Sequence, residues 1–181
     1  MRAVLGLRPC GPRQQNSEVV RAHWISHVTT AASDRSFPPR VALLLPVVLL
    51  LHQAEEWFGG FPEWTRYAVG SGVTADRFLV INALGLALFT AWTLAAFRDR
   101  RIAWIVAALA TLMGLNGVLH ALASILVGRY SPGTATGLLL SLPFSIVVLR
   151  AALGALPRGL VFSAMAAGVL FHGLVTILAL A

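Results

Sequence analysis

Residues 41–58 read VALLLPVVLLLHQAEEWF. Residues 41–51 are purely apolar, and the whole stretch has nearly the ~20 residues that a helix needs to cross a bilayer core. Its second part carries His52, Glu55 and Glu56. A charged carboxylate near the bilayer centre costs ~2.5 to 3.5 kcal/mol even on lenient insertion scales. Other helices of the protein must therefore shelter the polar end of this segment.

The remaining chain has the composition of an integral membrane protein. Of its 181 residues, 57% are hydrophobic, and the mean hydropathy is +0.78, well above the values of ordinary soluble domains. Five apolar blocks are separated by short polar connectors, which predicts an all-α bundle of five transmembrane helices. The expected spans are residues 41–58, 78–97, 102–127, 134–149 and 160–180, which together form a membrane domain over residues 41–181.

Residues 1–40 are rich in arginine and proline and contain no long apolar run. This composition excludes a signal-peptide core and predicts a disordered cytoplasmic tail. His23 and His27 in this segment are interpreted as solvated side chains. The single Cys10 excludes an internal disulfide framework and a cysteine-rich zinc site.

All 14 basic residues are arginines, and the formal net charge is +7. No nucleic-acid-binding motif accompanies this charge, so nucleic acid is not an expected partner. With the amino terminus inside, only Arg66, Arg77 and Arg129 lie outside, and the other 14 − 3 = 11 arginines lie on the cytoplasmic side. The positive-inside rule therefore predicts a multi-pass protein of the plasma membrane with a cytoplasmic amino terminus and an external carboxyl terminus.

In this topology polar residues from four helices reach a similar depth. On the first helix the histidine and the two glutamates fit within an arc of about 100° and can face one cavity. On the third helix, a histidine four residues after an asparagine shares its face. The residues expected in the outer half of the bilayer are His52, Glu55, Glu56, Asn82, Asn116 and His120, with His172 slightly deeper.

Adjacent ionised glutamates repel each other, so a proton or a cation must accompany them in an apolar environment. A divalent metal held by carboxylate and imidazole groups would balance the negative charge and would be bound by the histidines. Zinc, iron and manganese accept such ligands. The expected ligands are His52, Glu55, Glu56, His120 and His172, and Asn82, Asn116 and Tyr130 are expected to lie beside them.

Three functions fit such a site. In a metal-dependent intramembrane hydrolase, Glu55 or Glu56 would act as general base. The HEXXH and HXXEH zinc motifs carry two histidines on one helix, whereas here the further ligands must come from other helices. A proton- or ion-coupled transporter, possible as a homo-oligomer, would bind and release its ion at the same residues. A structural or accessory protein would use them only as a buried polar network.

Two motifs carry a resemblance. His52-Gln53-Ala54-Glu55-Glu56 matches HXXEE, and Tyr130-Ser131-Pro132-Gly133 matches YXPG. Over about residues 41–175 the chain resembles a family of bacterial membrane proteins of unknown function described by these motifs and by further histidines. The resemblance implies a membrane protein with a shared site, in which His120 and His172 are the additional histidines, and it implies no activity. Pro132 and Gly133 also favour a tight turn, which either brings Tyr130 over the site or simply joins two helices.

Overall fold

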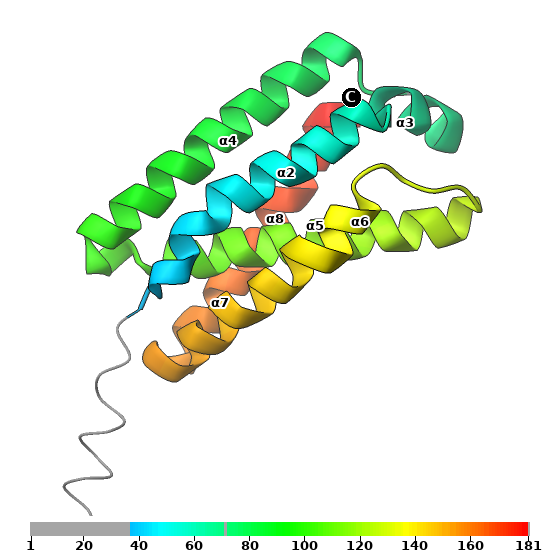
Figure 1. The fold of residues 1–181 in the computed structure, drawn as a ribbon. Helices are drawn as coiled ribbons and strands as arrows, with labels where there is room; N and C mark the ends of the chain where they lie inside the picture. The colour runs from blue at the N-terminus through cyan, green and yellow to red at the C-terminus, as the bar shows by residue number, and fades with distance from the viewer. Residues whose placement is uncertain (1–36, 71, 181) are drawn as a thin grey trace, which may run out of the picture. The chain divides into compact units, whose positions relative to one another are not determined.

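A computed structural model of the chain describes residues 37–70 and 72–180, which form one helical bundle (Figure 1). Within these residues, five helices are long and apolar enough to cross a membrane. They are Arg40–Phe58, Ala75–Arg98, Arg100–Val127, Thr134–Ala155 and Arg158–Leu180. The predicted all-helical architecture with five apolar helices is confirmed at this level. Residues 1–36 of the predicted tail, with Cys10, His23 and His27, lie outside the described residues.

Several of these long helices combine shorter elements of different helical type. In chain order the elements are η1 (Arg40–Leu44), α2 (Leu45–Phe58), α3 (Phe61–Val69), α4 (Ala75–Arg98), η2 (Arg100–Ile102), α5 (Trp104–Val127), α6 (Thr134–Thr136), η3 (Gly137–Ser141), α7 (Leu142–Ala155) and α8 (Arg158–Leu180). The segments η1 and η2 are 3₁₀ turns, and η3 is a π-helical turn.

The connector between the first two spans contains the helix α3, whereas the sequence predicts only a short polar connector there. Pro62 lies in the first turn of α3, where its missing N–H group removes no helical hydrogen bond. This proline therefore begins a helix instead of preventing one. The ring of Phe61, at the start of α3, lies 5.2 Å from the ring of His120, so α3 covers one end of the bundle.

Two helix boundaries differ from the predicted ones for local reasons. The helix α4 begins at Ala75 because the Thr74 hydroxyl caps it by accepting a hydrogen bond from the Arg77 N–H group at 3.3 Å. The fourth span continues past Arg150 to Ala155. Arg150 is exposed, and its long side chain can reach the head groups from within a helix.

The helix α5 is the centre of the bundle. It packs against α7 and α8, while α2 packs against α4, and Figure 1 shows α2 and α4 side by side. A Cβ atom added at Gly168 of α8 would lie 2.4 Å from the carbonyl oxygen of Ala108 in α5. Gly168 therefore permits a close approach of α8 to α5. Val106, Ala107 and Ala110 of α5 belong to the buried apolar core at this interface.

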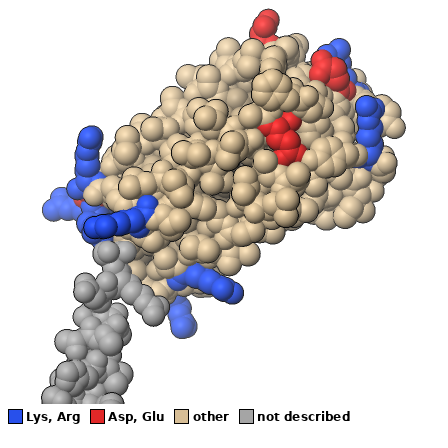
Figure 2. All heavy atoms as spheres, in the orientation of Figure 1, with Lys and Arg blue, Asp and Glu red and all other residues tan. Residues whose placement is uncertain are grey.

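Charged side chains lie mainly at the ends of the long helices. Basic side chains lie toward the two ends of the view in Figure 2, and the broad surface between them is mainly uncharged. Exposed leucines on several helices contribute to such surface. The arginines at one set of helix ends are Arg40, Arg98, Arg100, Arg101, Arg150 and Arg158. An uncharged belt between two charged ends is the surface expected of a protein that crosses a bilayer.

Candidate metal centre

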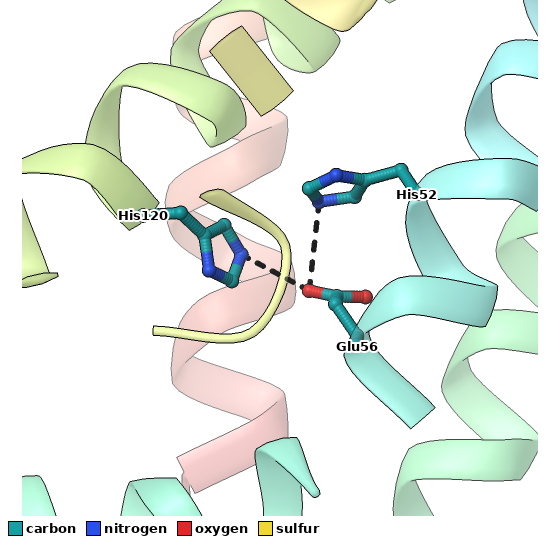
Figure 3. Close-up of side chains that lie close together, drawn as sticks. All are labelled: His52, Glu56 and His120. Atoms are coloured by element: carbon teal, nitrogen blue, oxygen red, sulfur yellow. Dashed lines mark ion pairs between the residues drawn. The ribbon is translucent and has the colours of Figure 1, made fainter. Parts of the chain in front are cut away.

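Three buried side chains from two helices meet beneath α3. His52 and Glu56 are one turn apart on α2, and His120 comes from α5. Their exposed fractions are only 3%, 6% and 6%. The Glu56 Oε1 atom lies 3.0 Å from His120 Nε2 and 3.6 Å from His52 Nε2 (Figure 3). One ligand atom from each residue lies within 4.8 Å of the other two, close enough for all three to reach one metal ion.

The second ring nitrogen of each histidine contacts a hydroxyl group. His52 Nδ1 lies 2.9 Å from Thr136 Oγ1, and His120 Nδ1 lies 3.0 Å from Ser131 Oγ. Histidine ligands of metals usually donate this second N–H group to a neighbouring acceptor, which fixes the tautomer and the ring orientation. Both rings are therefore held with Nε2 directed at Glu56.

The predicted tight turn lies directly against the two rings. The Thr134 N–H group donates to the Ser131 carbonyl oxygen at 3.1 Å, which closes the turn around Pro132 and Gly133. Gly133 has φ +101°, and a Cβ atom added there would lie 2.9 Å from His52 Cε1. This position in the turn requires glycine because it combines a positive φ with contact to an imidazole.

Glu55 is separated from the three-residue cluster by its own hydrogen bonds. Its carboxylate accepts N–H groups from Gly133 at 3.0 Å, Ala135 at 3.1 Å and Thr136 at 2.6 Å. It also accepts the hydroxyl groups of Thr136, at 2.5 Å, and of Tyr130. The first N–H groups of a helix have no acceptor within the helix, and a negative charge is favourable there. Glu55 therefore fastens α2 to the start of the fourth span.

Tyr130 is half-exposed beside this carboxylate. Partial burial, and secondarily the hydrogen bond to Glu55, raise the pKa of the Tyr130 hydroxyl from its usual value. The phenol therefore remains a hydrogen-bond donor at physiological pH. Of the two positions that the sequence left open for Tyr130, the structure has the one beside the site.

His172 is linked to the cluster through Asn116. The His172 Nε2 atom lies 3.0 Å from Asn116 Oδ1, and Asn116 Nδ2 lies 2.7 Å from His52 Nε2. If His172 donates to the amide oxygen and the amide donates to His52, every group in the series is matched as donor and acceptor. Metal ligation by Glu55 and by His172 stays a prediction, because each is engaged by other partners here.

Asn82 lies on α4, the helix that packs against α2. Its side-chain amide donates to the Phe78 carbonyl oxygen at 3.0 Å, and its own carbonyl oxygen accepts from Gln53 Nε2 at 3.1 Å. Asn82 thus joins α4 to the HXXEE segment through Gln53, a residue to which the sequence analysis gave no role.

A cavity of about 500 Å³ adjoins the cluster. Side chains of His52, Glu56 and His120 line it together with Asn116 and His172, and most of its other lining residues are apolar. The buried ligand atoms therefore face a space in which a small apolar molecule fits.

The sequence analysis also missed the two hydroxyl groups that orient the histidines. Ser131 lies inside the YXPG motif and Thr136 lies three residues after it. Serine and threonine in a turn before a helix commonly form capping hydrogen bonds. This preference is the signal in the sequence that could have pointed to Ser131 and Thr136. That signal does not indicate a histidine as the partner.

Comparison with known proteins agrees with the two motifs. A family model described as "Protein of unknown function with HXXEE motif" matches residues 43–148. The match includes the cluster of His52, Glu56 and His120 as well as the turn at Gly133, whereas α8 with His172 follows it. No curated protein and no solved structure matches the chain. Since the matched residues make up more than half of its length, the chain belongs to the family of proteins of unknown function with the HXXEE motif.

Proposed function

We propose that this chain is a plasma-membrane protein that binds a divalent metal ion at His52, Glu56 and His120 and uses it for hydrolysis within the membrane. One observation carries the proposal: two imidazole Nε2 atoms and one carboxylate oxygen converge in a buried place. Two histidines and one glutamate are the protein ligands of several zinc hydrolases, and iron and manganese also accept this set.

Burial of the cluster supports a bound cation. Glu56 is almost fully buried, and the described side chains around it include two imidazoles but no arginine contact. Burying a carboxylate without compensation is strongly unfavourable, and neutral imidazoles offset its charge only in part. A divalent ion would balance the carboxylate and use both Nε2 lone pairs.

The two adjacent glutamates then have different roles. Glu56 binds the metal, and Glu55 positions the turn that carries Ser131 and Thr136. When bound, the metal supplies Lewis acidity, which activates a water molecule or polarises a carbonyl oxygen. His172 lies on the wall of the same cavity, and Asn116 holds its ring by accepting a hydrogen bond from His172 Nε2.

The proposal includes the membrane orientation. Thr136 and the ligands lie at the end of the bundle opposite Arg40, Arg98 and Arg158. An excess of arginine marks the cytoplasmic side. We therefore assign the amino terminus to the cytoplasm, the carboxyl terminus to the outside and the metal centre to the outer half of the bilayer.

Metal analysis of protein purified in detergent without chelators tests this function. We expect near-stoichiometric zinc, iron or manganese in the wild type and almost none in His52→Ala, Glu56→Gln and His120→Ala. His23→Ala is the matched control, because it removes a histidine of the amino-terminal segment, and it should keep the metal. Wild-type protein without bound metal would contradict the proposal.

A proton- or ion-coupled transporter is the second candidate, and one observation favours it. Hydrogen bonds run continuously from His172 through Asn116, His52 and Thr136 to Glu55. Proton flux into liposomes that contain the purified protein tests this candidate. Flux that Asn116→Leu abolishes would support transport, whereas absence of both flux and metal would favour a structural network.

A further inference from the structure

We propose that the substrate of this centre is an acyl lipid that enters from the bilayer between α4 and α8, so that its chain fills the cavity and its ester or amide carbonyl reaches the cluster. This inference rests on the proposed function, because it names the class of substrate for the same site. Three properties of the cavity support it.

The cavity is long. Its lining on α4 runs from Phe78 to Phe89, eleven residues apart, and its lining on α8 runs from Phe171 to Leu180, nine residues apart. At ~1.5 Å per residue these segments are about 16 and 14 Å long. An extended hydrocarbon chain matches a space of this length.

The cavity opens on the side of the bundle. Leu84 on α4 and Leu178 on α8 line it, yet they are 60% and 57% exposed. His52 and Glu56, which also line it, are almost fully buried. The opening therefore lies between two apolar helices, on a surface that a membrane would cover. A lipid reaches such an opening from the bilayer, whereas a polar solute would first have to enter the hydrocarbon.

The inner end of the cavity is polar. The ligand atoms and the Asn116 amide are there, and Trp64 lines the cavity nearby. The buried Nε1 atom of Trp64 has no hydrogen-bond partner among the residues that the structure describes. A carbonyl or ester oxygen would accept a hydrogen bond from this indole, whereas a pure hydrocarbon would leave it unsatisfied. The cavity thus suits a molecule with one polar group and one apolar chain.

A second copy of the chain is a poorer occupant. A helix with its side chains is about 10 Å wide. The buried end of the cavity, beside His52 and Glu56, is enclosed by side chains of α2, α4 and α5. A helix can cover its opening, but only a slimmer molecule can reach His52 and Glu56.

A substitution that fills the cavity tests whether a lipid occupies it. A Cβ atom added at Gly85, which lines the cavity, would meet only Gln53 Nε2, at 4.0 Å. Gly85→Leu should therefore occupy the space without displacing the backbone. Gly173→Leu is the matched control, because Gly173 lies on α8 outside the lining and a Cβ atom there meets nothing within 4 Å.

The probe is phosphatidylcholine with a photoreactive diazirine in one acyl chain, incorporated into nanodiscs with the full-length protein. After illumination, mass spectrometry locates the labelled residues. We expect label on Leu112, a partly buried residue of α5 that lines the cavity. This label should fall about tenfold in Gly85→Leu, as for a ligand whose space is taken, and should persist in Gly173→Leu.

Metal analysis of the same samples distinguishes the two proposals. Unlabelled Leu112 in metal-loaded wild type would overturn the lipid proposal and leave the metal centre intact. A second copy of the chain found over the opening of the cavity would have the same meaning. Equal label in both variants would also overturn it. Labelled Leu112 in metal-free wild type would support the lipid site and remove the hydrolase. Gly85→Leu with normal metal but little label would support both.

Discussion

Gly133 lies in direct contact with the ring of His52, since a Cβ atom on Gly133 would be 2.9 Å from His52 Cε1. The same added atom would lie 3.0 Å from His120 Cε1. Gly133→Ala should therefore push both rings out of position and lower metal affinity by about 10- to 100-fold, the range observed when groups that orient metal ligands are changed. Metal titration of the purified, chelator-stripped protein measures this effect.

The control for this change is Gly128→Ala. Gly128 also has a positive φ, +67°, but a Cβ atom there meets nothing within 4 Å. Each substitution forces alanine into the left-handed region at about 1–2 kcal/mol. Only Gly133→Ala should weaken metal binding. An equal loss of metal in both variants would mean that backbone strain, and not contact with the rings, explains the effect.

Glu55 and Glu56 should respond differently to the same substitution. Glu55→Gln replaces a carboxylate oxygen that accepts hydrogen bonds with an NH₂ group that faces donors, including the Thr136 N–H. We expect it to lower the free energy of unfolding by about 2–3 kcal/mol, as for loss of hydrogen bonds to a charged group. Glu56→Gln should leave metal-free stability nearly unchanged and abolish metal binding. Thermal unfolding with EDTA, followed by tryptophan fluorescence, makes the comparison, and identical profiles would contradict the division of roles.

Thr136→Val removes the hydroxyl that contacts His52 Nδ1 and keeps the side-chain shape. Metal affinity should fall about 10- to 100-fold, since the ring loses the group that fixes its tautomer. Thr90→Val provides the control, because the Thr90 hydroxyl only donates to the Leu86 carbonyl oxygen of its own helix. Unchanged affinity in Thr136→Val, measured by competition with a metal-sensitive dye, would count against the orienting role.

Asn116→Ala should not weaken metal binding. The Asn116 amide lies 2.7 Å from His52 Nε2, the nitrogen that we assign to the metal, so it competes with the ion. Removing one such hydrogen bond should raise the affinity by about fivefold, equivalent to ~1 kcal/mol. Isothermal titration with zinc measures the change. A large loss of affinity would instead make Asn116 a ligand or an essential support.

The sequence predicted the helices well because apolar composition determines them almost alone. It was less informative at the connectors. The helix α3 was missed because Pro62 and the flanking glycines suggest a loop, although proline is compatible with a first helical turn. The fourth span was expected to end at Leu149, before Arg150, because a charge usually ends an apolar block, but an exposed arginine can remain helical.

At the site, helix geometry brought the polar residues to one region but could not separate two neighbours on one helix. Glu55 and Glu56 differ by about 100° in direction, and both directions pointed into the expected cavity. The different roles of Glu55 and Glu56 depend on the turn that follows Tyr130. The N–H groups of Gly133 and Ala135 in this segment donate to Glu55. A contact between α2 and a connector so distant in sequence leaves no periodic signal in either segment.

X-ray absorption by the metal in the purified wild-type protein tests the central claim most directly, because it reports the ligands themselves. The two-histidine, one-glutamate centre predicts a first shell of nitrogen and oxygen at about 2.0–2.2 Å. It also predicts outer-shell scattering from two imidazole rings, those of His52 and His120. Absence of bound metal, or a shell of oxygen without imidazole scattering, would contradict the account. Scattering from three rings would contradict the assignment of two and would make His172 a ligand.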